Sequence, residues 1–456
     1  MRPLRSLRDE FFKYLLAKVI KKCKVNQGLV KKMKQYSQMD AAELSALKSE
    51  LESVFSRYKE NGKKLNMTRG VPSDDQLALC NDMLTCLTAN DYKSANGTDC
   101  RNYGGLDGIP EVKKIFADLL ELTPDEVVVG GSSSLALMFD NVSVNVSHGV
   151  REGKPWQSQG QIKFLCPSPG YDRHFTICNY FHIDMIPVAM GEDGPDMDVI
   201  EKLVSSDPMI KGIWCVPKYS NPTGIVYSDE TIKRFAKLKP AADDFRIYWD
   251  NAYAIHDLGE TKKILNIVRL CEEAGNPNMV YVFSSFSKVS FAGASMTCMA
   301  SSKSNCEYIK QRLTAQTIGP DKLTHLRHAR FFKDAANVMA HMEKHAQILR
   351  PKFKLVNDKL ESHLGGLGIG TWTKPEGGYF VSFDSLDGLA KRIVALCSEA
   401  GVALTPAGAT YPNGKDPKDS NIRIAPTFPP LTELEEAMEI FCVAVKLASA
   451  EKLLNT

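Results

Sequence analysis

The 456-residue sequence has no long apolar run. Its longest nearly apolar stretch, residues 440–445, ends at Lys446, far short of the roughly 20 residues that a membrane-spanning helix needs. With 43% hydrophobic and 24% charged residues, the composition also excludes disordered and collagen-like chains. We expect a globular protein without an integral membrane segment, and long enough for two or three packed units.

Paired cysteines, internal repeats and low-complexity segments are also absent. The twelve cysteines stand singly, without a CxxC pair or a Cys/His cluster. The sequence therefore predicts neither a metal site nor a secreted disulfide framework. Reducing, cytoplasmic surroundings are the simplest interpretation.

Acidic residues are scarce at the N-terminus. Residues 1–35 hold eleven Lys and Arg but only Asp9 and Glu10, a net charge of +9, so the rest of the chain carries −6 of the total +3. A mildly acidic body argues against a nucleic-acid groove. Apolar residues at helical spacing from Phe12 to Cys23 predict a basic amphipathic helix. We interpret residues 1–38 as an extension; the alternatives are a helix that binds a partner or membrane surface, and an organelle-targeting segment.

Helices alternate with short apolar runs from about residue 108 to 300, a pattern typical of βαβ units and a mostly parallel sheet. Before this region, segment 41–64 predicts a helix closed by a glycine. After it, predicted helices at 325–364, 389–400 and 432–450 mix with strands. We expect an α/β fold, with a large domain at 76–324 and a small α+β domain formed by 39–75 and 325–456.

Five apolar runs are the predicted strands of the large domain: 127–129, 162–166, 213–216, 245–249 and 279–283. In open α/β sheets, ligands bind outside the carboxyl ends of the strands. The last three runs end in the polar clusters Tyr-Ser-Asn-Pro-Thr-Gly (219–224), Asp-Asn-Ala-Tyr (250–253) and Ser-Ser-Phe-Ser-Lys (284–288). Each cluster alone is typical of a turn, a helix cap or a solvated loop. Their order on three successive strand ends points to a site.

The first two runs add an anion site and an aromatic ring. Run 127–129 leads into Ser132, Ser133 and Ser134 and then a helix. Backbone N–H groups and the positive end of the helix dipole favour an anion there, although a plain Ser-capped helix is the alternative. Run 162–166 leads to Tyr171, which either stacks on a ligand or packs in the core.

The ordered set Asn-Pro-Thr-Gly, Asp-x-x-Tyr and Ser-x-Ser-Lys resembles the fold-type I pyridoxal-phosphate aminotransferases. A pyridoxal cofactor needs a lysine for its Schiff base and a carboxylate that keeps its pyridine nitrogen protonated. Segments 65–77, 166–175, 376–384 and 421–430, among others, resemble the aspartate aminotransferase branch of the MocR-like family. This resemblance runs from about residue 40 to the C-terminus and implies a large domain with a mostly parallel seven-stranded sheet.

The resemblance implies a role for each cofactor residue. Lys288 is the Schiff-base lysine and proton shuttle, Asp250 holds the pyridine nitrogen, and Asn221 and Tyr253 bond the ring 3-oxygen. The remaining cofactor contacts are Ser132, Ser133, Ser134, Ser285 and Ser287 around the phosphate, Tyr171 on the ring, and Tyr103, which reaches the phosphate across a homodimer interface. Mainstream members also carry an arginine eight residues after the lysine. Met296 stands there in this sequence, so the phosphate site must be completed otherwise.

The resemblance also implies the substrate contacts. Arg423 clamps the α-carboxylate, for which a planar two-pronged donor fits better than lysine. Asn221 and Gly70 border the substrate, and Arg69 either binds a distal carboxylate or is an exposed turn residue.

The expected reaction is ping-pong transamination between an amino acid and a 2-oxoacid, with aspartate and 2-oxoglutarate as the substrates, in a homodimer with shared active sites. One alternative is another enzyme of the same fold, such as an aromatic or kynurenine aminotransferase or a β-lyase. A transcriptional regulator with an aminotransferase-like domain is the other. Such regulators need an N-terminal winged-helix module of some sixty residues, and no helix-turn-helix pattern is evident, so no nucleic-acid partner is expected.

Overall fold

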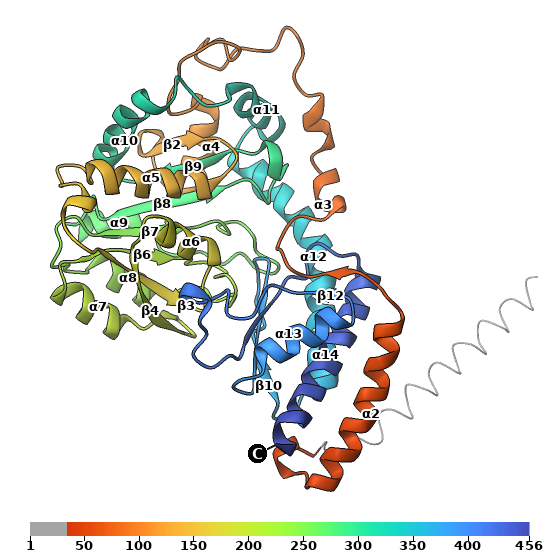
Figure 1. Cartoon of the computed structure of the whole chain (residues 1–456). Helices are drawn as coiled ribbons and strands as arrows, with labels where there is room; N and C mark the ends of the chain where they lie inside the picture. Colours follow the sequence, from red (N-terminus) through yellow and green to blue (C-terminus); the bar gives the residue numbers. More distant parts are fainter. Residues whose placement is uncertain (1–33, 456) are drawn as a thin grey trace, which may run out of the picture.

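The computed structural model describes residues 34–455, which form a large and a small domain (Figure 1). The amphipathic helix predicted in the basic head falls on residues that lie outside this description. None of the helices within residues 34–455 is long and apolar enough to cross a bilayer.

The large domain is built on one eight-stranded sheet with the order β2-β9-β8-β7-β6-β3-β4-β5. Its strands are β2 (Val127–Gly130), β3 (Lys163–Ser168), β4 (Asp184–Gly191), β5 (Gly194–Pro195), β6 (Ile210–Cys215), β7 (Arg246–Asp250), β8 (Val280–Ser285) and β9 (Thr297–Ala300). The central pairs from β4 to β8 are parallel, whereas β9 is antiparallel to both β8 and β2. Seven of these strands have four or more residues, and the two-residue β5 adds an eighth at the edge.

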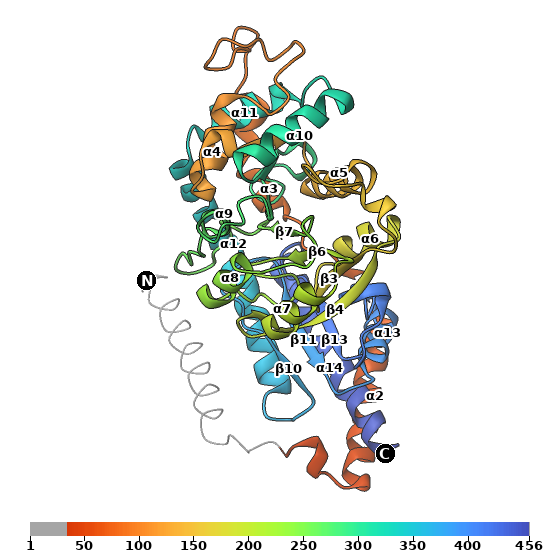
Figure 2. The same cartoon turned by 90° about the vertical axis from the view of Figure 1, so that its left-hand side faces the viewer.

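Side chains on the two faces of this sheet enter two different cores, because successive strand residues point to opposite faces. Trp214, Tyr248 and Phe283 pack beneath α5 and α6, while Ile247 and Trp249 pack on the opposite face. Figure 2 shows helices on both sides of the strands. The helices of this domain are α3 (Asp74–Ala78), α4 (Pro110–Leu120), α5 (Ser134–His148), α6 (Asp172–Tyr180), α7 (Met197–Ser206), α8 (Asp229–Ala236), α9 (Ile267–Glu273), α10 (Lys303–Gln316) and α11 (Lys322–Phe332), with short 3-10 helices at Asn81–Leu84, Pro124–Glu126, Trp156–Ser158 and Ala292–Ala294.

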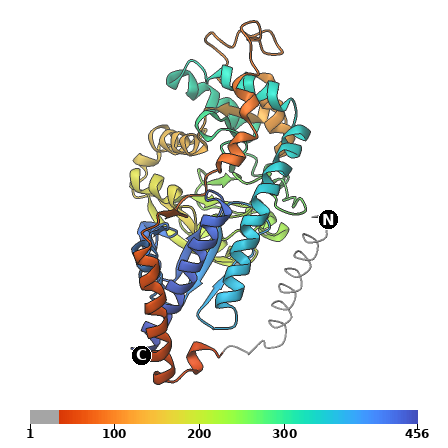
Figure 3. The same cartoon turned by 90° about the vertical axis from the view of Figure 1, so that its right-hand side faces the viewer.

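The small domain joins both ends of the described chain. Its helices are α2 (Ala41–Glu60), α12 (Ala335–Leu364), α13 (Ala390–Glu399) and α14 (Leu431–Leu454), with 3-10 helices at Tyr36–Gln38 and Pro412–Gly414. Its strands are β10 (Gly370–Trp372), β11 (Val381–Ser385) and β13 (Asn421–Ile424) in an antiparallel sheet, and the parallel pair β1 (Leu65–Asn66) and β12 (Val402–Ala403). The helices α2, α14 and α12 lie side by side (Figure 3).

The local sequence explains where α2 begins and ends. The Asp40 side chain accepts a hydrogen bond from the Glu43 N–H, and the Glu43 carboxylate accepts one from the Asp40 N–H, a capping box that stabilises the first turn. Gly62, with φ of +59°, follows the last turn in a conformation that glycine adopts without strain. The predicted helix and its closing glycine are therefore confirmed.

The helix predicted over 325–364 is instead two helices. Lys333 has φ of +67°, which ends α11, and the Asp334 side chain then caps α12 by accepting from the Asn337 N–H. The first part of α12, including Met342, packs in the large-domain core, and Ala346 onward packs in the small-domain core. The change of domain thus falls within α12, later than the predicted boundary at residue 325.

The small domain also begins earlier in the chain than predicted. The predicted small domain starts at residue 39, but the Tyr36 side chain is only 2% exposed within the small-domain core. Its N–H donates to the Leu367 carbonyl at 3.1 Å. Residues from Tyr36 onward therefore belong to the small domain, because a buried aromatic side chain is part of the core it fills.

Candidate active site

A cavity of about 370 Å³ lies where the carboxyl ends of the central strands meet the small domain. Its walls contain every predicted site residue except Tyr103: Arg69, Gly70, Ser132, Ser133, Ser134, Tyr171, Asn221, Asp250, Tyr253, Ser285, Ser287, Lys288 and Arg423. Asp172, Arg173 and Phe380, which the sequence did not single out, line it too. We call this the active-site cavity.

Lys288 follows β8 and places its amine against two aromatic rings. The Nζ atom lies 5.0 Å from the Tyr253 ring centre and 5.6 Å from that of Tyr379. Burial lowers the pKa of the Lys288 amine, and the negative charge of Asp250 opposes this only in part. The lowered pKa increases the share of the neutral amine, which is the nucleophilic and basic form.

Asp250 ends β7 and is held by a histidine. Its Oδ2 atom lies 3.0 Å from His174 Nε2, and both side chains are almost fully buried. The His174 ring stacks on Trp214 at 4.4 Å between ring centres. Within the described chain Asp250 Oδ1 is buried without a hydrogen-bond partner, which costs free energy unless a donor arrives. The N–H of a protonated heterocycle in the cavity fits this requirement.

The three serines form the start of α5 at one end of the cavity. Ser133 caps the helix by accepting from the Ala136 N–H at 3.2 Å. The Ser287 hydroxyl donates to the Ser132 carbonyl at 2.9 Å, and the Ser285 and Ser287 hydroxyls lie 2.7 Å apart. This network ties the loop after β8 to the loop before α5. The N-terminus of a 15-residue helix, lined by hydroxyls, suits a phosphate.

Asn221 and Tyr253 face the same space. The Asn221 Oδ1 atom accepts from Arg423 Nη1 at 3.1 Å, which leaves its amide hydrogens available to a ligand. Burial raises the pKa of the Tyr253 hydroxyl well above its usual value, with the nearby Tyr171 and Asp250 adding to the effect. The protonated phenol of Tyr253 can therefore donate a hydrogen bond. Tyr171 lines the cavity, and burial raises the pKa of its hydroxyl to about 12.

Arg423 enters the cavity from β13 of the small domain. Its side chain is 7% exposed, and Nη1 donates to Asp172 Oδ1 at 3.0 Å while Nη2 donates to Thr405 Oγ1 at 3.2 Å. The Phe380 ring centre lies 4.9 Å from the guanidinium carbon. This arginine is fixed on three sides, so its direction toward the cavity is set before a ligand binds.

Two more arginines border the cavity. Arg69 and Arg173 are exposed, and no ion pair of either is found within residues 34–455. The neighbouring Gly70 packs tightly, since a Cβ atom there would lie 2.5 Å from Phe380 Cζ. Arg69 and Arg173 are thus free to meet a second anionic group of a ligand, while Gly70 keeps Phe380 in place.

Tyr103 does not reach the cavity of its own chain. It lies in the loop that precedes α4, which projects from the large domain (Figure 1), and its side chain is 81% exposed. Within residues 34–455, no contact covers the exposed Tyr103 ring.

Residues 39–456 match the profile of a protein family described as aspartate amino-transferase. The chain belongs to the aspartate aminotransferase family. It is 44% identical to the aspartate aminotransferase of Corynebacterium glutamicum over 418 residues, which cover 91% of this chain and 96% of the relative. The crystal structure of an aspartate transaminase from the same organism superposes with a TM-score of 0.89 at 44% identity, covering 91% of this chain and 98% of the other.

More distant aminotransferases share the fold. The α-aminoadipate aminotransferase of Thermus thermophilus, complexed with N-(5'-phosphopyridoxyl)-L-leucine, has a TM-score of 0.70 at 19% identity, and the match covers 86% of this chain and 93% of that one. The fold-type I aminotransferase fold and the family resemblance inferred from the sequence are both confirmed.

His174 and Asp172 are functional candidates of this aminotransferase chain that sequence reasoning missed. Both stand in the segment Tyr171-Asp172-Arg173-His174, directly after the predicted ring residue. One turn of α6 brings His174 back against Asp250. The spacing of three residues from Tyr171 was a usable signal, because residues three apart share a helix face.

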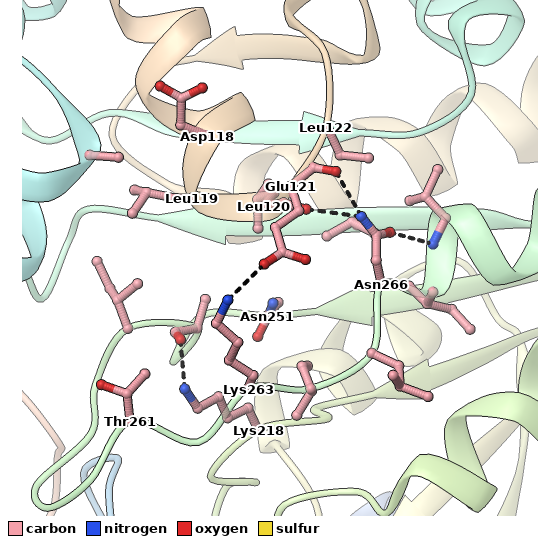
Figure 4. Close-up of a pocket in the computed structure, with 18 of the residues that line it drawn as sticks. Asp118, Leu119, Leu120, Glu121, Leu122, Lys218, Asn251, Thr261, Lys263 and Asn266 are labelled. Atoms are coloured by element: carbon pink, nitrogen blue, oxygen red, sulfur yellow. Dashed lines mark hydrogen bonds and ion pairs between the residues drawn. The ribbon is translucent and has the colours of Figure 1, made fainter.

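A second cavity, of about 310 Å³, lies behind this aminotransferase site, between the end of α4, segment 261–268 and the start of α12 (Figure 4). Trp249 and Asn251 line it, whereas Asp250 and Ala252 line the active-site cavity. Polar groups around it bind one another: Lys263 pairs with Glu121 at 3.3 Å, and the Asn266 amide donates to the Leu120 and Glu121 carbonyls. Lys288 and Asp250 do not line this second cavity.

Proposed function

We propose that the protein transfers the amino group of aspartate to 2-oxoglutarate, using pyridoxal phosphate bound in the active-site cavity. The observation that carries this proposal is one cavity holding Lys288, the unpartnered Asp250 Oδ1 and the preset Arg423. Membership of the family makes the chain an aminotransferase. The aspartate aminotransferase of C. glutamicum, at 44% identity, supports aspartate as the donor.

The residues present fit pyridoxal phosphate. Asp250 Oδ1 would accept from the protonated pyridine nitrogen, and His174 holds the other carboxylate oxygen. Asn221 and Tyr253 would donate to the ring 3-oxygen, Tyr171 would stack on the ring, and the serines at the start of α5, with Ser285 and Ser287, would hold the phosphate. When bound, the cofactor supplies an aldehyde carbon and a ring that withdraws electrons from the substrate carbon.

Lys288 would transfer the proton in this reaction. Its amine, whose pKa burial lowers, would hold the cofactor through the aldehyde carbon until a substrate amine takes that place. The freed amine would then accept the proton of the substrate α-carbon and carry it within the cavity. A charged ammonium could not accept this proton, so the lowered pKa of Lys288 is part of the mechanism.

Arg423 and Asn221 hold the substrate. A planar guanidinium can donate two parallel hydrogen bonds to the α-carboxylate, and this fixes the direction of the bond from the α-carbon to its hydrogen. Arg69 or Arg173 would bind the second carboxylate of aspartate or 2-oxoglutarate. Because donor and acceptor both carry these two carboxylates, one cavity can serve both half-reactions in turn.

We also propose a homodimer with shared active sites. Tyr103 projects 81% exposed from its own chain and would complete the phosphate site of the partner, where Met296, buried in the core, offers no charge. The eleven cysteines of the described region are all free thiols, which supports reducing, cytoplasmic surroundings.

Absorbance tests the function directly. Purified protein incubated with pyridoxal phosphate should gain a visible absorption band, and a panel of amino donors should then change this band. Aspartate and glutamate should act at the lowest concentrations, with phenylalanine, kynurenine and cysteine as matched controls. A faster response to an aromatic donor would replace the proposed substrate, and production of pyruvate and sulfide from cysteine would indicate a β-lyase.

A further inference from the structure

Asp172 forms an ion pair with Arg423, the arginine that is proposed to bind the substrate carboxylate. Its Oδ1 atom accepts from Arg423 Nη1 at 3.0 Å, and the same Nη1 donates to Asn221 at 3.1 Å. The opposite Nη2 donates to Thr405, whose own hydroxyl donates to the Thr68 carbonyl at 2.7 Å. The only unpartnered nitrogen of this guanidinium within the described chain is the buried Nε. A substrate carboxylate that enters the cavity therefore meets Arg423 already paired with the Asp172 carboxylate.

We propose that Asp172 is a resident counter-ion of Arg423, which the substrate α-carboxylate displaces, so that Asp172 sets the affinity for carboxylate substrates. This inference rests on the proposed function, in which Arg423 binds the α-carboxylate. No covalent bond changes in the exchange: one carboxylate leaves Nη1 and another takes its place.

Burial explains why a counter-ion is needed. Arg423 is 7% exposed, and an unpaired charge at such a depth is strongly destabilising. Asn221, Thr405 and the Phe380 ring are neutral partners, so Asp172 supplies the negative charge of the described chain that pairs with the guanidinium. The pair therefore preserves the direction of Arg423 between catalytic cycles.

The position of Asp172 explains why it can be released. Its side chain is 28% exposed, so water can solvate the freed carboxylate. Asp172 is also the first residue of the nine-residue α6, where the helix dipole stabilises a negative charge. Its neighbour Arg173 borders the same cavity. Because water, the helix dipole and Arg173 can stabilise it, the Asp172 carboxylate loses less free energy on leaving Arg423 than a buried carboxylate would.

The exchange predicts tighter binding when Asp172 is neutralised. A neutral amide or hydroxyl holds the guanidinium less strongly than a carboxylate, because charge-assisted hydrogen bonds are roughly twice as strong as neutral ones. Substrate carboxylates then compete with a weaker resident partner. We expect the dissociation constant of a dicarboxylate to fall about tenfold, the ratio that corresponds to one charge-assisted bond.

The test is isothermal titration of the cofactor-loaded protein with succinate, a dicarboxylate without an amine that cannot react. Asp172→Asn is the principal variant, and Asp172→Ser, which keeps a residue suited to a helix start, serves if the first folds poorly. Glu192→Gln is the matched control, since it removes one exposed acidic charge in the turn between β4 and β5, outside the cavity. Arg423→Leu is the variant that tests the carboxylate site itself.

The expected result is succinate binding about tenfold tighter in either Asp172 variant, with Glu192→Gln unchanged and Arg423→Leu no longer binding. Unchanged or weaker binding in folded Asp172 variants, with binding still lost in Arg423→Leu, would overturn the counter-ion role alone. Wild-type affinity in Arg423→Leu would instead overturn the carboxylate site on which the proposed function depends.

Discussion

Both proposed half-reactions require the amine of Lys288. We predict that Lys288→Ala still binds pyridoxal phosphate, through Asp250 and the start of α5, but loses turnover by at least about 10³-fold, because both the covalent link and the proton carrier are removed. Reduction with borohydride should fix the cofactor to the wild type and not to the variant.

Lys202→Ala is a suitable control for that variant, because Lys202 is an exposed lysine on α7, outside the cavity. It should keep wild-type turnover and remain labelled after reduction. Turnover near the wild-type value in Lys288→Ala would remove this residue from the reaction.

Gly70 affects the substrate through the Phe380 ring. A Cβ atom at residue 70 would lie 2.5 Å from Phe380 Cζ and 3.2 Å from Tyr379 Cβ, so Gly70→Ala must displace the ring that packs on Arg423. We predict that KM for aspartate rises about tenfold while the affinity for pyridoxal phosphate changes little, because a small misplacement of a positioning group is costly. Steady-state kinetics and a cofactor titration separate the two effects.

Gly259→Ala is the matched control, since a Cβ atom there meets no other atom within 4 Å and the residue lies outside the cavity. It should retain the wild-type KM. An unchanged KM in Gly70→Ala would show that Phe380 does not position Arg423.

At the scale of the elements, α11 contains a buried histidine that has to remain neutral. The His328 Nδ1–H donates to the Thr324 carbonyl at 2.7 Å, and Nε2 lies 2.8 Å from the Ser290 hydroxyl. Burial lowers the pKa of His328 to about 4, with the positive charge of Arg327 and the nearby His325 adding to the effect and Asp321 opposing it.

The sign of the resulting pH dependence follows from proton binding. Between pH 6.5 and pH 4 the unfolded chain binds a proton at His328 that the folded chain does not, so stability falls as the pH falls through this window. At pH 5 the loss is about 2 kcal/mol. We predict that His328→Gln has a flatter dependence of its urea midpoint between pH 7.5 and pH 5, whereas His148→Gln, at an exposed site, keeps the wild-type slope.

The elements that the sequence predicted share one property: their pattern is visible within a few residues. Buried apolar runs marked β2, β3, β6, β7 and β8, and the polar clusters after them marked the cavity, because carboxyl ends of parallel strands share one edge. By contrast β4, with the solvent-facing pattern of Asp184–Gly191, and β9, which runs antiparallel at Thr297–Ala300, escaped prediction. Their place in the sheet is set by backbone pairing with β3, β8 and β2, and not by a local apolar pattern.

Some site residues were not predicted from the sequence for the same reason. Asp172 and His174 become meaningful only when α6 places them against Arg423 and Asp250, which are 251 and 76 residues away in sequence. Tyr36 shows the limit at a boundary, since a single buried aromatic beside a basic segment leaves no periodic signal. Tertiary contacts decide the role of all three residues, and only His174 has a local signal, its spacing of three residues from Tyr171.

Tyr36 gives a test of where the small domain begins. We predict that removing residues 1–33 leaves turnover and the unfolding midpoint unchanged, because the cavity lining and the small-domain core described above lie within residues 34–455. Removing residues 1–38, or the change Tyr36→Ala, should lower the free energy of unfolding by about 3 kcal/mol, as for other buried aromatic side chains. Thermal unfolding of the three variants measures this difference, and equal midpoints would return the boundary to residue 39.

At the scale of the whole molecule, the cavity of one chain contains every predicted contact except Tyr103. The side chain that is missing is also one of the most exposed large hydrophobic groups of the described chain. A second copy of the chain resolves both facts at once, since each copy would cover the ring of the other and receive a hydroxyl for its own phosphate site. In the proposed homodimer, catalysis would require both copies, because a separated chain would lack part of its cofactor site.

Mixed subunits test this arrangement. Lys288→Ala and Tyr103→Phe chains should each form dimers of low activity, because every site of the first lacks the lysine and every site of the second lacks the hydroxyl. If Tyr103 serves the partner, a mixed dimer has one site with both changes and one site with neither. Unfolding and refolding an equimolar mixture makes half of the dimers mixed, each with one intact site. The mixture should therefore recover up to about a quarter of wild-type turnover. Ser158→Ala, at an exposed position of the 3-10 helix Trp156–Ser158 and outside the cavity lining, replaces Tyr103→Phe in the control mixture, which measures the effect of diluting one subunit with another. Turnover that stays at the level of the parents, with mixed dimers verified by tagged subunits, would place Tyr103 in its own chain or outside the reaction.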